Sequence, residues 1–249
     1  MKAVVCTKYG ETEAAVEQNA AFHHRYASDR PFVTLKLAVS IDGAIADAAH
    51  RPGWLTGEPA RRAVHALRAG HDAIAVGSGT VIADDPQLTV RHGRRPRVAP
   101  QRIVFDRRVR LPHTSKVVRT AKRVPTMVVT DDPPPPLAAG LAARGVSVLA
   151  ARSLGDALRA LRSQGVESML CEGGAILAGA LLGAGAVDRM VIFRAPVLLG
   201  AGALSAFGFA PPHTVPDAPR WRILDQEQLG EDVMTVYVRS RFRFVASNP

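Results

Sequence analysis

The positions of apolar residues along the chain predict a series of short strands separated by helices. In Phe32–Val39 the polar side chains of Thr34 and Lys36 alternate with apolar ones, a period of two that is typical of a strand. Further short apolar runs end at glycine, proline or acidic residues, which interrupt a strand. They predict strands over residues 72–77, 102–106, 126–130, 146–150, 168–172, 187–195, 222–224 and 233–239.

Helices are predicted between these strands, where apolar residues recur at three- and four-residue spacing. The clearest one starts after Thr56, a candidate capping residue, and has Pro59 in its first turn, a position that proline tolerates. Its apolar stripe is Ala60, Val64 and Leu67, and its opposite face carries Arg61, His65 and Arg68. Other helices are expected over 11–26, just before 84–86, and over 137–144, 153–164 and 174–184. The four prolines at 133–136 predict an irregular loop.

Strands that alternate with helices indicate an α/β fold, in which a largely parallel sheet is covered by helices on both faces. The last two strands follow each other without a helix between them, so the sheet is expected to finish antiparallel at its C-terminal end. No composition shift divides the main part of the chain into separate domains.

The charge of the chain is strongly positive. Its 249 residues have a formal net charge of +10, and most of the 32 basic residues are arginine. The densest basic stretch runs from Arg91 to Arg123, where Asp106 is the single acidic residue and Phe105 the single Phe, Tyr or Trp. Because that stretch lacks the stacking platform of single-strand binders, nucleic acid is not the expected partner. The charge favours the approach of small anions, and a non-catalytic basic binding protein remains an alternative.

Several other classes of protein are disfavoured. The chain has no apolar run of about 18 residues, so no membrane span is expected, and it lacks a secretory signal, which favours the cytoplasm. Cys6 and Cys171 are expected to be unpaired thiols. The glycine fingerprint of Rossmann folds, the P-loop and the zinc-ligand pattern of deaminases are all missing, and no metal site is expected.

Two glycine-containing turns join a strand to a helix, at 77–80 (Gly-Ser-Gly-Thr) and at 172–174 (Glu-Gly-Gly). Glycines let the backbone approach a phosphate, and a helix N-terminus supplies unpaired N–H groups. Each turn alone is equally consistent with a simple tight turn, but two at strand ends of one parallel sheet predict a phosphate-bearing ligand there. Glu172 lies in one of them. Lys36 requires a partner such as a phosphate or a carboxylate if its face of the sheet is covered.

The order of the motifs resembles a known family. Three segments carry the N-terminal part of the resemblance: Pro31-Phe-Val-Thr-Leu-Lys-Leu-Ala-Val-Ser-Ile-Asp-Gly43, Trp54-Leu-Thr56 with the arginine-bearing helix up to Arg68, and Gly79-Thr-Val-Ile-Ala-Asp-Asp-Pro-Gln-Leu-Thr-Val-Arg91. The later segments are Cys171-Glu-Gly-Gly-Ala-Ile-Leu-Ala-Gly-Ala-Leu-Leu182 and Ala195-Pro-Val-Leu-Leu-Gly200. Together they resemble the reductase domain of the bifunctional riboflavin-biosynthesis deaminase–reductase, over about residues 20–240.

This resemblance implies a dihydrofolate-reductase-like, three-layer α/β/α fold, usually dimeric, with a mostly parallel sheet and an antiparallel C-terminal finish. It implies that NADPH reduces 5-amino-6-(5-phosphoribosylamino)uracil to the ribitylamino compound, with the hydride going to C1′ of the ring-opened imine. Because NADPH supplies the hydride, the protein must align the nicotinamide with the substrate and hold the substrate phosphate.

The resemblance also assigns residues. Those expected to bind NADPH are Ala38, Trp54, Thr80, Asp84, Arg107, Gly174, Ala175, Ile176 and Leu177. Those expected to contact the substrate are Arg68, Leu88, Arg91 and Glu172, and the arginines suit its phosphate. Lys36 and Glu172 are the candidates for polarising or protonating the reacting region. Arg107 follows a predicted strand end, where a planar cation favours the 2′-phosphate of NADPH over NADH.

Departures from the family pattern leave the substrate open. Pro52 stands where the family has a serine that touches substrate, and proline offers neither a hydroxyl nor an N–H group. Ala175 stands where a proline usually follows the glycine pair, and alanine also suits a helix start. Within residues 1–30 only a stretch like the trailing helix of the deaminase domain is present, so these are expected to be an extension and 31–249 the reductase domain. A paralogous NADPH reductase of another heterocycle, such as a pterin or dihydrofolate, is the alternative.

Overall fold

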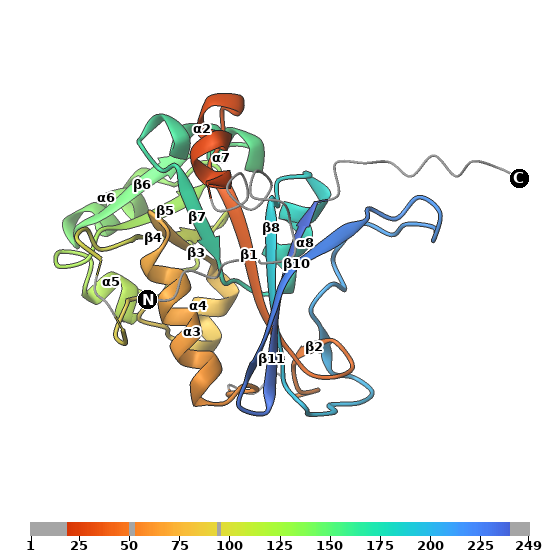
Figure 1. Ribbon diagram of the computed structural model, residues 1–249. Coiled ribbons are helices and arrows are strands. Elements are labelled where there is room, and N and C mark those ends of the chain that lie inside the picture. The colour runs from red at the N-terminus through yellow and green to blue at the C-terminus, as the bar shows by residue number, and fades with distance from the viewer. Residues whose placement is uncertain (1–18, 50–52, 94–95, 240–249) are drawn as a thin grey trace, which may run out of the picture.

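The computed structural model describes residues 19–49, 53–93 and 96–239 (Figure 1). Nine strands form its main sheet, in the order β10-β11-β8-β1-β7-β3-β4-β5-β6. Their bounds are β1 Phe32–Val39, β3 Ala73–Gly77, β4 Gln101–Phe105, β5 Thr126–Thr130, β6 Val146–Ala150, β7 Ser168–Cys171, β8 Arg189–Arg194, β10 Trp221–Leu229 and β11 Asp232–Arg239. Strands β1 and β3 to β8 are parallel, whereas β11 pairs antiparallel with β8 and β10. The predicted parallel sheet with an antiparallel finish is confirmed.

Helices cover both faces of this sheet (Figure 1). One face carries α3 (Glu58–Ala69), α4 (Ser78–Asp84), α5 (Lys116–Arg119) and α6 (Pro135–Ala143), and the other carries α7 (Leu154–Ser163) and α8 (Ala175–Gly183). The alternation along β3 shows why two cores form: Ile74 and Val76 pack under α4 and α5, while Ala73 and Ala75 pack under α7 and α8. The three-layer α/β/α architecture is therefore confirmed.

Some elements are too short to leave a pattern in the sequence. The strands β2 (Ala44–Ala46) and β9 (Leu204–Ser205) form a separate antiparallel pair that was not predicted, and neither was α5. The helix α2 (Ala20–Ala27) overlaps the predicted helix at 11–26, of which the first part lies outside the described residues. None of the described helices is long and apolar enough to cross a bilayer.

Two local predictions were wrong. The helix α6 begins at Pro135, inside the stretch expected to be irregular, because a proline in the first turn of a helix needs no hydrogen bond from its nitrogen. Thr56 does not cap α3: Gly57 is the N-cap, and its N–H donates to Asp232 Oδ2 at 2.7 Å. A carboxylate from the start of β11 thus does the work expected of the neighbouring threonine.

Candidate active site

The two glycine-containing turns meet at one edge of the sheet. They follow β7 and β3, which are neighbouring parallel strands. A Cβ on Gly173 would lie 2.8 Å from the nitrogen of Gly77 and 2.9 Å from the Cα of Val76, a separation that only glycine permits. The Gly174 N–H donates to Thr80 Oγ1 at 3.2 Å and so ties the second turn to α4. Both turns therefore follow strands of one parallel sheet, as predicted, and the structure places them in direct contact.

The N-terminus of α8 opens beside these turns. Gly174 is its N-cap and has no side chain to cap the first turn, and Thr80 accepts only the N–H of Gly174 itself. The first-turn N–H groups of a helix lack partners within the helix, and they favour an anion. Ala175 and Leu177 are buried and Ile176 is exposed, so these cofactor candidates offer backbone N–H groups rather than polar side chains.

Arg68 and Glu172 form a buried, bidentate ion pair at the same edge. Nε of Arg68 donates to Oε1 of Glu172 at 2.6 Å and Nη2 donates to Oε2 at 2.9 Å, and the side chains are only 12% and 7% exposed. Burial alone raises the pKa of Glu172, but the charge and hydrogen bonds of Arg68 outweigh burial and hold that pKa below its ordinary value. Glu172 is therefore an ionised acceptor at neutral pH, not a proton donor.

Lys36 lies in the middle of β1, on the face of the sheet that α3 covers. Its Nζ lies 5.7 Å from the centroid of the Phe193 ring, and its charge interacts with that of Glu172. Burial is the main influence and lowers the pKa of Lys36, while the Glu172 carboxylate opposes it and Arg68 lowers the pKa further. Glu172 is thus the carboxylate whose charge acts on Lys36, but the two do not form a close ion pair. A lysine with a lowered pKa gives up its proton more readily than an exposed one.

Arg91 and Leu88 belong to the loop over residues 85–91, which follows α4. Leu88 has a φ of 50° and a side chain that is 2% exposed, packed into the core with residues of β4 and α5. Any contact between Leu88 and a substrate would therefore come from its backbone. Nη1 of Arg68 donates to the Thr89 carbonyl at 3.0 Å, which ties this loop, and hence Arg91, to the ion pair.

The other cofactor candidates lie on separate elements around this cluster. Ala38 follows Lys36 on the same face of β1 and packs against the core beneath α3. Asp84 is the last residue of α4, and burial raises its pKa. Trp54 is 77% exposed, and the Arg61 guanidinium carbon lies 5.3 Å from its ring centroid. Pro52, the departure from the family pattern, lies outside the described residues.

Arg107 follows β4, two strands away from β7 in the sheet. Its side chain is 80% exposed and pairs with Asp131, which follows β5: Nη2 and Nε of Arg107 donate to Oδ2 at 2.8 and 3.0 Å. The sequence-based prediction for Arg107 did not include this carboxylate, which competes with a phosphate for the same guanidinium.

Two residues near the site were not predicted to matter. His65 on α3 is 4% exposed, and its position three residues before Arg68 is the signal that places it on the same face of the helix. Arg102 is fully buried in β4, and an arginine inside an apolar strand is itself a signal. Its N–H groups donate, over 2.7 to 3.3 Å, to the carbonyls of Gln87, Val117 and Val124 and to the hydroxyls of Thr120 and Thr126.

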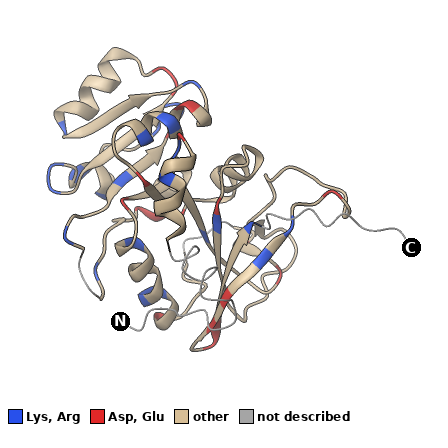
Figure 2. Ribbon diagram, turned by 45° about the horizontal axis from the view of Figure 1, so that its top comes forward, with Lys and Arg blue, Asp and Glu red and all other residues tan. Residues whose placement is uncertain are grey.

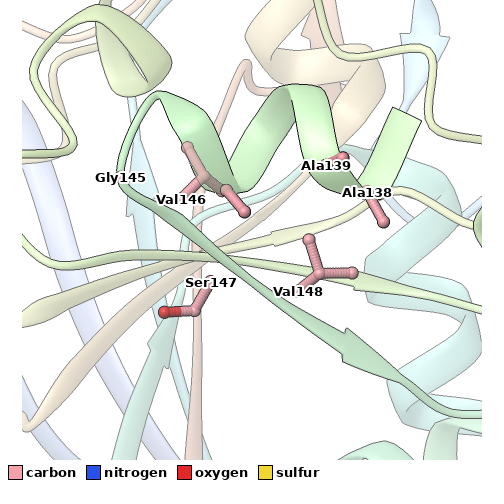
Figure 3. Close-up of a pocket in the computed structure, with 7 residues that line it drawn as sticks. Ala138, Ala139, Gly145, Val146, Ser147 and Val148 are labelled. Carbon is pink, nitrogen blue, oxygen red and sulfur yellow. The ribbon is translucent and has the colours of Figure 1, made fainter. Parts of the chain in front are cut away.

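A hollow away from this edge lies between α6 and the edge strand β6 (Figure 3). It has a volume of about 600 Å³ and is lined by Ala138, Ala139, Ala142, Gly145, Val146, Ser147 and Val148. Because Ser147 is the only one of these with a polar side chain, the hollow lacks the charged groups that a phosphorylated ligand needs. Within the described ranges, no group of three or more His, Cys, Asp or Glu residues is placed to hold a metal ion.

The strand order and the position of the charged edge define an α/β protein of the dihydrofolate-reductase-like type, in which ligands bind beyond the carboxyl ends of the parallel strands. The model of the RibD C-terminal domain matches residues 31–235, and the chain belongs to this family. Its similarity to solved structures agrees: it superposes on Acinetobacter baumannii RibD with a TM-score of 0.82 and 34% identity, over 92% of this chain and 64% of that one.

Curated relatives differ in how much of their length the chain covers. It is 33% identical to the riboflavin biosynthesis protein RibD of Aquifex aeolicus over 91% of its own length, but spans only 63% of that relative. It is 35% identical to the 2,5-diamino-6-ribosylamino-4(3H)-pyrimidinone 5′-phosphate reductase of Methanothermobacter thermautotrophicus, over 84% of this chain and 98% of the relative. The chain thus spans less than two thirds of RibD and nearly all of the archaeal reductase.

Proposed function

We propose that this chain is an NADPH-dependent reductase of riboflavin biosynthesis that converts 5-amino-6-(5-phosphoribosylamino)uracil to the ribitylamino compound. The archaeal relative of matching length is named as the reductase of a closely similar ribosylamino pyrimidinone phosphate, which supports this substrate class. The observation that carries the proposal is the Arg68–Glu172 pair, which interacts with the charge of Lys36 and adjoins the two packed glycine turns.

The shape of the turns fits a dinucleotide. A Cβ on Gly174 would lie 3.3 Å from Thr80 Oγ1, so glycine leaves room there. The first turn of α8 has no cap from its own N-cap side chain and suits a pyrophosphate. We assign the pyrophosphate to residues 174–177 with Thr80 beside it. Trp54, Ala38 and Asp84 are assigned to the rest of the cofactor. The nicotinamide supplies the hydride when NADPH is bound.

Reduction of the imine requires a hydride at C1′ and a proton at the nitrogen, which together convert the C=N bond into CH–NH. Lys36 is the proton donor in this proposal, because its pKa is lowered by burial and its ammonium group carries the proton that the nitrogen must receive. Glu172 stays ionised and its charge favours the protonated form of Lys36, and solvent returns the proton to Lys36 after turnover. Proton donation of this kind contributes roughly 10²- to 10⁴-fold in rate.

The substrate phosphate is assigned mainly to Arg91. Three nitrogens of Arg68 already donate to Glu172 and to Thr89, whereas Arg91 has a side-chain contact with the Gln87 Oε1 at 3.1 Å that lies at the exposed surface. Arg68 therefore orients Glu172 and adds positive charge, and the more accessible Arg91 makes the bidentate contact.

The test is NADPH consumption by the full chain with this substrate, followed by product identification. We expect Lys36→Met to lower kcat at least about 100-fold, while Lys122→Met, an exposed lysine on the basic stretch, leaves it unchanged. No consumption with the pyrimidine phosphate but turnover of dihydrofolate or a pterin would favour the alternative substrate. If the chain does not bind NADPH saturably, both the pyrimidine-phosphate reductase and the reductase of another heterocycle are rejected.

The basic stretch offers less free charge than its sequence suggests. Figure 2 shows Lys and Arg spread over several elements with Asp and Glu among them. Within the stretch Arg102 is buried, Arg107 pairs with Asp131, and Lys116 Nζ lies 3.6 Å from Asp85 Oδ2. These contacts argue for the reductase over a basic binding protein. We further propose that residues 31–249 form the catalytic domain and that the protein is a homodimer, which light scattering would measure.

A further inference from the structure

The loop that carries Arg91 is held by side chains from other elements. Residues 85–91 include two left-handed, non-glycine positions, Asp85 and Leu88, with φ of 40° and 50°. Side chains bind the loop backbone at alternate residues: Arg102 donates to the Gln87 carbonyl at 3.3 Å, Arg68 to the Thr89 carbonyl at 3.0 Å, and the Arg91 N–H donates to His65 Nδ1 at 3.2 Å. The last of these contacts acts directly on the proposed phosphate-binding residue.

His65 is built to be an acceptor at this place. Because the Arg91 N–H donates to Nδ1, the ring must be neutral, with its proton on Nε2. Burial, then the charges of Arg68, Arg91 and His92, lower the pKa of His65 to about 4, and Glu172 opposes them. The ring of His92 packs edge-on at a centroid distance of 4.8 Å. Nδ1 is therefore available as an acceptor throughout the neutral pH range.

We propose that His65 is a positioning residue for the substrate phosphate: by accepting the Arg91 N–H it fixes the backbone from which the Arg91 guanidinium reaches the phosphate. This inference rests on the proposed function, in which Arg91 binds that phosphate. Among the described residues, the long side chain of Arg91 is anchored by an exposed contact to Gln87 alone, so its placement depends on its backbone. A displacement of about 1 Å in such a positioning element can cost roughly 100-fold in rate.

Two polar substitutions at His65 test whether its role depends on the hydrogen-bond acceptor at the position of Nδ1 or only on the volume of the side chain. In His65→Asn the amide oxygen falls near the place of Nδ1, whereas in His65→Gln it reaches about one bond further. We expect His65→Asn to keep the substrate KM within about twofold, and His65→Gln and His65→Leu to raise it about tenfold, the effect of one hydrogen bond of roughly 1.4 kcal/mol. The KM for NADPH should not change. Should His65→Leu fail to fold, the Asn and Gln variants still decide; equal KM values for them would overturn the proposal.

A double-mutant cycle with Arg91→Ala tests whether His65 acts through Arg91. We expect the double variant His65→Gln/Arg91→Ala to have the same substrate KM as Arg91→Ala alone. Without the Arg91 guanidinium, the hydrogen bond from the backbone of residue 91 to residue 65 no longer affects phosphate binding. Losses that add, or an equal loss with the dephosphorylated substrate, would assign His65 a general structural role and overturn the proposal.

Failure of the positioning role of His65 can be distinguished from failure of the proposed function. If the wild-type chain does not reduce the pyrimidine phosphate, the proposed function fails, and the cycle is then measured as the affinity for ribose 5-phosphate by calorimetry. Weakened binding in His65→Gln that matches Arg91→Ala would support the positioning role. Unchanged binding would overturn it.

Discussion

Gly173 packs against the backbone of Gly77, so that a Cβ on Gly173 would lie 2.8 Å from the Gly77 nitrogen. The obstructing atoms are backbone and cannot rotate away, as the end of a side chain could. We therefore expect Gly173→Ala to lower the free energy of unfolding by about 1–3 kcal/mol, the usual cost of overpacking. Urea denaturation at equilibrium measures this difference.

The matched control is Gly79→Ala, in the other glycine-containing turn. A Cβ on Gly79 meets nothing within 4 Å, and Gly79 lies within the helix α4. Alanine there should leave the free energy of unfolding unchanged or raise it by up to about 1 kcal/mol. If Gly173→Ala is as stable as this control, the close approach of the two turns is not as the structure has it.

That the two turns lie at the same edge of the sheet was predictable, whereas their direct contact was not, because β7 and β3 are neighbours only in the spatial order of the strands. Once 72–77 and 168–172 are expected to be strands of one parallel sheet, their carboxyl ends lie at the same edge whatever the side chains do. The cap of α3 depends instead on a contact between residues 175 positions apart, Gly57 and Asp232. Local reasoning could offer only Thr56, and it was wrong.

Asp232 should therefore matter to α3 although it lies on β11. Asp232 is 3% exposed, and its carboxylate accepts the N–H of the N-cap residue, Gly57. We expect Asp232→Ala to lower the free energy of unfolding by about 1–2 kcal/mol, as the loss of a helix cap does. Asp232→Asn keeps an acceptor oxygen and should lose less than half of that. Thermal unfolding followed by circular dichroism compares the two, and equal losses would contradict the capping role.

The family resemblance named candidate residues for the site, but it did not give their mutual contacts. Arg68 and Glu172 were each expected to contact substrate, yet they lie 104 residues apart in the chain and bind each other. A sequence shows which charges are available, whereas the pairing depends on which strand end α3 crosses. The same limit explains why the carboxylate beside Arg107 was not expected.

Breaking the Arg68–Glu172 pair should be costly. Glu172→Gln leaves a buried guanidinium without its counter-charge, so we expect a loss of roughly 3–5 kcal/mol in the free energy of unfolding at pH 7. The folded-state pKa of Glu172 lies below the ordinary value, so the stabilisation is complete above about pH 4.3 and is lost as pH falls through the folded-state pKa. The difference in the free energy of unfolding between the wild type and Glu172→Gln should therefore become smaller only at acidic pH.

The control for this pair is Glu58→Gln. Glu58 pairs with Arg62 one turn along α3, where both side chains are more than half exposed. Such a pair contributes about 0.3–0.5 kcal/mol at most, and salt screens it. Unfolding curves at several pH values, with and without added salt, distinguish the two pairs. A Glu172→Gln variant that resembles Glu58→Gln would contradict the buried ion pair.

The contact between Arg107 and Asp131 bears on the choice of cofactor. If Arg107 binds the 2′-phosphate of NADPH, it must exchange its carboxylate partner for that phosphate. We expect Arg107→Ala to raise the KM for NADPH about tenfold, equivalent to roughly 1.4 kcal/mol, and to leave the KM for NADH unchanged. Asp131→Asn removes the competing charge and should lower the KM for NADPH. Steady-state kinetics with both cofactors measures the two effects.

Arg108 provides the control, because it neighbours Arg107 in the chain and is exposed as well. Arg108→Ala removes the same charge from the same surface, so a KM for NADPH that rises equally in both variants would reflect the general field of the basic stretch. Two effects together would identify Arg107 as a ligand of the 2′-phosphate. The preference for NADPH over NADH should fall in Arg107→Ala but not in Arg108→Ala, and it should rise in Asp131→Asn. An Asp131→Asn variant that binds NADPH more weakly would contradict the competition, because a released guanidinium can only favour a phosphate.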